Sequence, residues 1–196
     1  MNEPDKEPSA PSADRKLAER AQWGSLAALA ISVLALAVGA YQTRLMQTQA
    51  RASVWPYVVI GLDYAEKGER SGFDLHVQNN GVGPALVRSV QVRFDGKPIG
   101  HWPELFDALK LHGTVAAVLQ GLRGIVIPPS TNRNTDVTAI AIAQPDAAKA
   151  VFESRTRLAI DICNCSIYDD CWVAHWLKSR PEPVAACHES AGEFDY

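Results

Sequence analysis

Residues 23–41 read WGSLAALAISVLALAVGAY, a run of nineteen positions without a charged side chain. At about 1.5 Å of rise per residue this run forms a helix of about 28 Å, close to the ~30 Å hydrocarbon core of a bilayer. Trp23 and Tyr41 stand at its two ends, where aromatic rings settle at the level of the lipid headgroups. The run therefore predicts one transmembrane helix with membrane lipid as its partner.

The run has two alternative interpretations. A buried core helix is disfavoured, because core helices seldom stay apolar on every face for five turns. A cleaved signal peptide stays open, since Val38, Gly39 and Ala40 offer the small residues of a cleavage site. The acid-containing residues 1–22 are long for the leader of a signal peptide, and residues 42–53 contain no Gly or Pro. The sequence favours an uncleaved anchor.

The charges that flank the run predict its orientation. Four Lys or Arg side chains precede it and two follow it closely, namely Lys6, Arg15, Lys16 and Arg20 before it and Arg44 and Arg51 after it. This excess favours a cytoplasmic N-terminus. Small residues recur at Gly24, Ala28 and Ser32, a pattern that suits ordinary anchor composition and also, as an alternative, a helix-mediated dimer.

The rest of the 196-residue chain is long enough for one folded domain. Residues 1–13 are rich in Pro, Ser and acids and are predicted to be a disordered cytoplasmic tail. Residues 14–50 are expected to form the helix with its flanks, and residues 51–196 the folded domain. The net charge is −3 and no basic cluster is present, so nucleic acid is not expected as a partner.

Residues 51–196 read as many short strands separated by Gly and Pro turns. Residues 73–77 alternate between apolar and polar side chains, and in 85–94 we expect Leu86, Val90, Val92 and Phe94 to point inward. The other predicted strands are 54–64, 124–127, 135–143 and 157–165, and the predicted short helices are 103–111 and 145–154. This pattern predicts a mainly β fold, an antiparallel β-sandwich of the immunoglobulin-like kind with one or two short helices.

Asn79, Gly81, Gly83 and Pro84 form a turn cluster between two of these strands. Asn tolerates a left-handed backbone and Gly permits positive φ, while Pro marks where strand pairing restarts. A phosphate-binding glycine loop requires a helix after it, whereas here a strand follows. The sequence therefore predicts a structural turn at these four residues.

Three stretches together carry a resemblance: RASVWPY at 51–57, VQNNGVGPALV at 77–87 and ICNCSIYDDCW at 162–172. They make the chain resemble uncharacterised bacterial inner-membrane proteins with one N-terminal span and a small periplasmic β-domain. The resemblance covers most of residues 20–176. It implies a bacterial inner-membrane location with the C-terminal domain in the periplasm, and it implies no activity, substrate or catalytic residue.

The four cysteines, Cys163, Cys165, Cys171 and Cys187, all lie in the last 34 residues. An even number of cysteines in an oxidising compartment predicts two disulfides. A hairpin through residues 166–170 favours the pairs 165–171 and 163–187 over the swapped pairing. Two alternatives are a soft-metal site completed by His175 and His188, and a set of reactive thiols. The spacings match no common zinc module, so no metal and no cofactor are predicted.

Other residues with polar or titratable side chains do not combine into a recognisable catalytic site. Asp169 and Asp170 are adjacent in the expected hairpin turn, where acids are usually solvated and only occasionally bind calcium. His101 and His112 flank the helix at 103–111, yet no nucleophile or orienting partner is apparent for either. Trp172 and Trp176 are expected in the core or at its rim, or lining a ligand groove. We predict no catalytic residue and no enzymatic activity.

The sequence thus predicts a membrane-anchored periplasmic domain that binds or supports another envelope protein, for instance along an exposed strand edge. The alternative is a metal- or thiol-handling envelope protein that uses the four cysteines.

Overall fold

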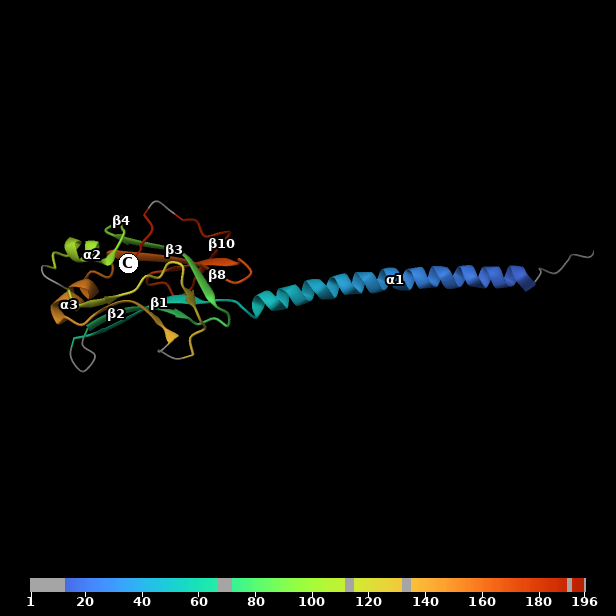
Figure 1. Ribbon diagram of the computed structural model, residues 1–196, viewed down its shortest axis with the longest axis horizontal. Coiled ribbons are helices and arrows are strands. Elements are labelled where there is room, and N and C mark those ends of the chain that lie inside the picture. Colours follow the sequence, from blue (N-terminus) through green and yellow to red (C-terminus); the bar gives the residue numbers. More distant parts are fainter. Residues whose placement is uncertain (1–12, 67–71, 112–114, 132–134, 190–191, 196) are drawn as a thin grey trace, which may run out of the picture. The chain divides into compact units, whose positions relative to one another are not determined.

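The structure is a computed structural model (Figure 1). It describes residues 13–66, 72–111, 115–131, 135–189 and 192–195. The chain divides into two compact units, Met1–Gln49 and Ala50–Tyr196. Most of the predicted disordered tail, residues 1–12, lies outside the described residues, as does His112.

The first unit is dominated by helix α1, Ala13–Ala52. The Ser32 hydroxyl donates to the carbonyl of Ala28 at 2.8 Å and the Thr43 hydroxyl to that of Gly39 at 2.9 Å. These bonds keep polar groups satisfied within the helix, as a lipid environment demands. Among the described residues, α1 is the one helix long and apolar enough to cross a membrane, a property it shares with signal sequences.

The second unit is the predicted antiparallel β-sandwich, and the prediction is confirmed. Its elements are β1 (Val58–Ala65), β2 (Gly72–Asn79), β3 (Ala85–Phe94), β4 (Lys97–Ile99), α2 (Trp102–Ala108), β5 (Ala117–Leu119), β6 (Val126–Ile127), β7 (Val137–Ile142), α3 (Pro145–Glu153), β8 (Leu158–Cys165), β9 (Cys171–His175) and β10 (Glu182–Val184). One sheet has the order β1-β2-β7-β5, and the other has the order β10-β9-β8-β3-β4 with β6 paired to β3. Figure 1 shows the sheets as two layers, with α2 and α3 at the same end.

The core lies between the sheets and follows from the alternation of the strands. In β2, Phe73, Leu75 and Val77 are buried, whereas Asp74 and His76 point to the opposite face. This is the alternation predicted for residues 73–77, because successive side chains of a strand point to opposite faces. The face of β2 that carries Asp74 and His76 is thereby left for a functional surface.

In β3 the prediction that Leu86 points inward is wrong. Leu86 is only half-buried, whereas Ala85 and Val87 are buried, as are Val90, Val92 and Phe94 further along the strand. The pairing of β3 with β8 shifts in register between Val87 and Ser89, which marks a β-bulge. The extra residue of the bulge shifts the alternation by one position, so odd-numbered side chains face the core before the bulge and even-numbered ones after it.

Several predicted bounds also change. Strand β1 begins at Val58 rather than at residue 54, because the carbonyls of Trp55 and Tyr57 accept hydrogen bonds from the turn after β2. The strand expected at 124–127 shrinks to Val126–Ile127. Helix α2 ends at Ala108, and Lys110 beyond it has a left-handed φ of 56°. Strands β4, β5 and β10, which no sequence pattern predicted, have three residues each.

Candidate functional site

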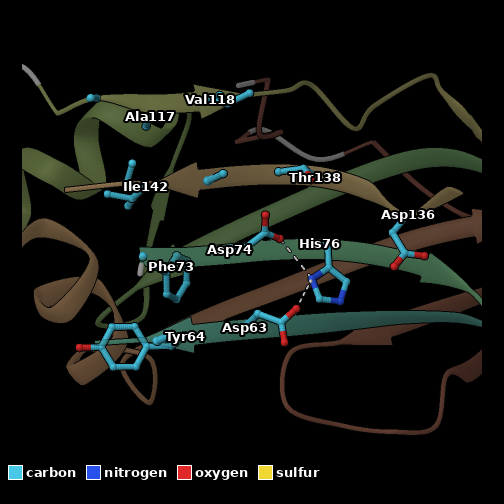
Figure 2. A pocket seen from close by; sticks show the side chains of 15 residues that line it. Asp63, Tyr64, Phe73, Asp74, His76, Ala117, Val118, Asp136, Thr138 and Ile142 are labelled. Carbon is cyan, nitrogen blue, oxygen red and sulfur yellow. Dashed lines mark hydrogen bonds and ion pairs between the residues drawn. The ribbon is translucent and has the colours of Figure 1, made fainter. Parts of the chain in front are cut away.

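A groove of about 850 Å³ lies over the four-stranded sheet (Figure 2). It is formed mainly by β1, β2 and β7 and by the segment that leads into β5. Its lining residues are Asp63, Tyr64, Ala65, Gly72, Phe73, Asp74, His76, Ala116, Ala117, Val118, Asp136, Thr138, Ala141, Ile142 and Ala143. Among the described residues this lining contains three carboxylates and one imidazole but no Lys or Arg, and this surplus of negative charge attracts cationic groups.

His76 lies between two of these carboxylates, as Figure 2 shows. Its Nδ1 is 3.2 Å from Oδ1 of Asp74 on the same strand and 4.0 Å from Oδ2 of Asp63 on β1. The ring is packed over Gly61, where a Cβ would come within 2.2 Å of His76 Nε2. The His76 side chain is therefore only 13% exposed and is held in one place between the two acids.

The third carboxylate, that of Asp136, is fixed by two hydrogen bonds. Gln78 Nε2 donates to its Oδ2 at 2.8 Å, and the Ser130 hydroxyl donates to its Oδ1 at 2.7 Å. Because Gln78 is on β2 together with Asp74 and His76, the three acids lie along one face of the sheet. The groove thus presents a row of negative charge whose positions are set by the strands.

The chemistry of this lining suits binding rather than catalysis. In the part of the lining that the structure describes, Tyr64 and Thr138 supply the two hydroxyl groups, and no Ser, Cys or Lys is present. The Tyr64 ring stacks on Phe152 at 4.1 Å between ring centroids, which engages it in packing. Strand β5 bounds the groove, pairs only with β7 and is the last strand of its sheet, and its Val118 side chain is 65% exposed.

Sequence reasoning did not identify this groove. The one usable signal was the polar side of the β2 alternation, which carries Asp74 and His76. Asp63 and Asp136 belong to other parts of the chain, and only the pairing of β1 and β7 with β2 brings them alongside.

The predicted turn from Asn79 to Pro84 packs against the segment before β1. Its glycines are not needed for positive φ, contrary to what the sequence suggested. Among the described residues, positive φ occurs at other glycines and not at Gly81 or Gly83, and Asn79 is not left-handed either. The glycines are needed for close approach instead: a Cβ on Gly81 would lie 2.3 Å from the Trp55 carbonyl oxygen, and one on Gly83 would lie 2.1 Å from that of Val54. Pro84 directly precedes β3, where pairing restarts.

Asn79 is fully buried and connects four backbone groups. Its Oδ1 accepts hydrogen bonds from the backbone N–H groups of Tyr57 and Gly81, both at 3.0 Å. Its Nδ2 donates to the carbonyls of Gly83 at 2.8 Å and Ile127 at 3.0 Å. The side chain therefore joins the segment before β1, the turn after β2 and strand β6.

The cysteines form two disulfides, Cys165–Cys171 and Cys163–Cys187, which is the pairing that the predicted hairpin favoured. Cys165 and Cys171 face each other across the β8–β9 pair. None of the four thiols is free, so the sulfur atoms cannot act as thiolate ligands of a metal while both bonds are intact. The two histidines of the metal alternative instead line a second pocket.

This second pocket, of about 230 Å³, lies on the outer face of the six-stranded sheet beside Cys163. His175 Nδ1 is 2.6 Å from Oδ1 of Asp161, and Asp161 also pairs with Arg93. Its lining residues are Ser89, Gln91, Asp161, Cys163, Val173, His175, Ala186 and His188.

Glu182 lies next to this pocket, with Oε2 at 3.5 Å from His175 Nε2. Lys178 donates a hydrogen bond to Glu182 at 2.9 Å and lowers the pKa of that carboxyl, and the nearby His175 lowers the pKa further. Glu182 therefore keeps its negative charge beside His175, across the pair of strands β9 and β10.

The other candidate residues from the sequence do not form a common site. Asp169 and Asp170 do not converge on a cation site, because Asp170 pairs with Arg51 at 2.7 Å and Asp169 lies 3.8 Å from Arg88. Trp176 is buried and does not line either groove described above, whereas Trp172 is half-buried against Trp55 with 6.4 Å between ring centroids.

At the ends of the apolar run, the side chains of Trp23 and Tyr41 are 74% and 70% exposed. Near α2, His101 pairs with Glu104 at 2.8 Å, and Trp102 is buried at the first turn of the helix. His101 thus interacts with an acid on its own helix and has no nucleophile among its described partners.

These features define a mainly β protein with an apolar N-terminal helix that is compatible with membrane anchoring. Residues 21–160 match the family described as a domain of unknown function, DUF8453, and the chain belongs to this family. The match spans the apolar helix and most of the sandwich and ends before the first cysteine. No curated protein and no solved structure matches the chain.

Proposed function

We propose that this protein is a single-pass protein of a bacterial inner membrane, with residues 23–41 as an uncleaved anchor. Its N-terminus faces the cytoplasm, and residues 51–196 form a periplasmic binding domain without catalytic activity. Two features support this topology independently. The excess of Lys and Arg before the anchor favours a cytoplasmic N-terminus, and two disulfides suit an oxidising compartment.

The intact mass of protein purified from membranes tests the anchor and the export together. We expect residues 1–22 to be retained, no thiol to be alkylated before reduction and four to be alkylated after it. Leu34→Arg adds a charge at the centre of the run at a cost of about 3 kcal/mol and should move protein to the soluble fraction. Leu17→Arg, outside the run, is the control. A chain that begins at Tyr41, or thiols alkylated without reduction, would contradict the proposal.

The binding surface in this proposal is the groove over the four-stranded sheet, and its ligand is a basic, extended segment of another envelope protein. The observation that carries the assignment is that the described lining residues include Asp63, Asp74 and Asp136 and no Lys or Arg. Strand β5 at its border is an edge strand, where an extended peptide adds to a sheet through backbone hydrogen bonds. The exposed Val118 and the small side chains of Ala116 and Ala117 leave room for such a peptide.

A pair of labelled decapeptides tests this surface on the full-length protein in lipid nanodiscs. One alternates lysine with valine, and the other has glutamate in place of lysine. Fluorescence anisotropy should show binding of the lysine peptide alone. The double variant Asp63→Asn/Asp74→Asn should weaken it about tenfold, because each exposed ion pair contributes about 0.2–1 kcal/mol.

The matched control is Asp107→Asn/Asp146→Asn, which changes the net charge equally at exposed acids outside the groove. It should leave the affinity for the lysine peptide unchanged. Equal weakening by both double variants would show that only the overall charge matters and would contradict the groove assignment. So would equal binding of the two peptides.

A further inference from the structure

The two disulfides touch each other. Cys165 Sγ lies 3.6 Å from Cys187 Sγ, although these atoms belong to different bonds. The sulfur atoms of Cys165, Cys171 and Cys187 all lie within 4.8 Å of one another. A thiolate generated at Cys187 would therefore already be in van der Waals contact with the sulfur of the other disulfide.

We propose that these four cysteines form a thiol–disulfide exchange relay that accepts two electrons from an external dithiol. The relay converts the resting pairs into a single bond between Cys165 and Cys187, with Cys163 and Cys171 as thiols. This activity is separate from peptide binding at the groove, which lies on the other sheet. Its substrate class is a dithiol of the oxidising compartment.

The reaction begins at Cys163, which lines the pocket of about 230 Å³ on the outer face of the six-stranded sheet. Cys163 is 9% exposed and its partner Cys187 is half-buried, whereas Cys165 and Cys171 are 3% and 7% exposed. His175 and His188 line the same pocket, and the hydrogen bond to Asp161 holds His175 in place. An incoming thiolate therefore meets the Cys163–Cys187 bond at this pocket, beside the imidazole rings of His175 and His188.

Each step conserves atoms and electrons. A thiolate of the dithiol attacks Cys163 Sγ, the Cys163–Cys187 bond breaks, and Cys187 leaves as a thiolate. The Cys187 thiolate attacks Cys165 Sγ, the Cys165–Cys171 bond breaks, and Cys171 leaves and takes up a proton. The second thiolate of the dithiol then attacks the dithiol's other sulfur atom, which is bonded to Cys163 in the mixed disulfide. This step closes the disulfide of the dithiol and releases Cys163, which takes up a proton. The dithiol is oxidised to its disulfide, and its two protons end on Cys163 and Cys171.

The product keeps the C-terminal segment tethered to β8, since Cys187 is still bonded to a cysteine of that strand. What is released is the covalent link between β8 and β9 at their hairpin end. Exchange thus moves the reduced site from the exposed segment around Cys187 to the buried Cys171.

The test uses the full-length wild-type protein in detergent with dithiothreitol as the dithiol. One molar equivalent is added, the reaction is quenched with acid, thiols are labelled with N-ethylmaleimide, and linked peptides are mapped by mass spectrometry. In the species with two thiols, we expect labels on Cys163 and Cys171 and a peptide linked through Cys165 and Cys187. Labels on any other pair, in particular Cys163 and Cys187, would overturn the relay.

Two single variants supply a matched comparison that requires no reductant. Cys163→Ser leaves the Cys187 thiol beside the second disulfide, so labelling should shift from Cys187 toward Cys171. Cys187→Ser leaves Cys163, whose sulfur is outside the set of three neighbouring sulfur atoms, so labelling should stay on Cys163. Labelling of Cys187 alone in Cys163→Ser would also overturn the proposal.

Discussion

Replacing Asn79 with alanine is expected to lower the free energy of unfolding of the sandwich by about 3–6 kcal/mol. The change leaves the half-buried N–H groups of Tyr57 and Gly81 without their acceptor and removes the donor to two carbonyls. A buried polar group without a partner costs about 1–3 kcal/mol, and Asn79 has no exposed surface at which water replaces the lost bonds. Urea unfolding of the full-length protein, followed by tryptophan fluorescence, measures the loss.

The neighbouring Asn80 is a close control, because it is exposed on the same turn. Asn80→Ala should change the free energy of unfolding by no more than about 0.5 kcal/mol. Asn79→Asp keeps an acceptor for Tyr57 and Gly81 but places a carboxylate oxygen against the carbonyls of Gly83 and Ile127, so it should also destabilise the sandwich. A small effect of Asn79→Ala, similar to that of Asn80→Ala, would show that the side chain does not hold the turn.

Replacing Phe194 with alanine is expected to destabilise the sandwich by about 3–5 kcal/mol, the usual range for a fully buried Phe. Phe194 is 1% exposed and packs edge-on against Trp102, with 4.8 Å between ring centroids. Its backbone N–H donates to the Val90 carbonyl at 2.8 Å. The preceding Glu193 carboxylate accepts hydrogen bonds from the Ser89 hydroxyl at 2.7 Å and the Val90 N–H at 3.0 Å. The C-terminal segment thus closes over the bulge of β3.

Thermal unfolding of full-length Phe194→Ala, Phe194→Leu and Ile167→Ala distinguishes this role from a generic loss of apolar area. Phe194→Leu keeps most of the buried volume and should cost clearly less than alanine. Ile167 is more than half exposed in the hairpin between β8 and β9, so Ile167→Ala should be nearly neutral. If Phe194→Ala melts at the wild-type temperature, the segment around it contributes little to the core.

Asn79 and Phe194 show how this sandwich holds the segments beside its strands. Asn79 ends β2, the strand that carries Asp74 and His76 of the groove, and Phe194 covers β3 near the bulge. In each case a single buried side chain connects segments that are far apart in the sequence. The groove and the disulfide pair lie on the outer faces of the two sheets, where they do not compete with the core.

The sequence by itself determined the elements that depend on local pattern. A span of nineteen uncharged residues predicts an apolar helix because helix length and transfer free energy are properties of the segment alone. Alternation in 73–77, the cluster from Asn79 to Pro84 and the helix-forming stretch from Pro145 are likewise local signals. The hairpin between Cys165 and Cys171 was also readable, because five residues separate these cysteines in the chain.

The tertiary structure alone decided what depends on contacts between distant segments. The bulge that turns Leu86 away from the core arises from the pairing of β3 with β8, and the three-residue strand β5 exists only through β7. Asp63, His76 and Asp136 line one groove because β1, β2 and β7 pair side by side. Cys187 lies beside Cys165 because its disulfide to Cys163 holds the C-terminal segment against β8. Contacts between distant segments produce no repeating pattern in the local sequence. Each strand could pair with several others, and packing of the whole core decides which pairs form.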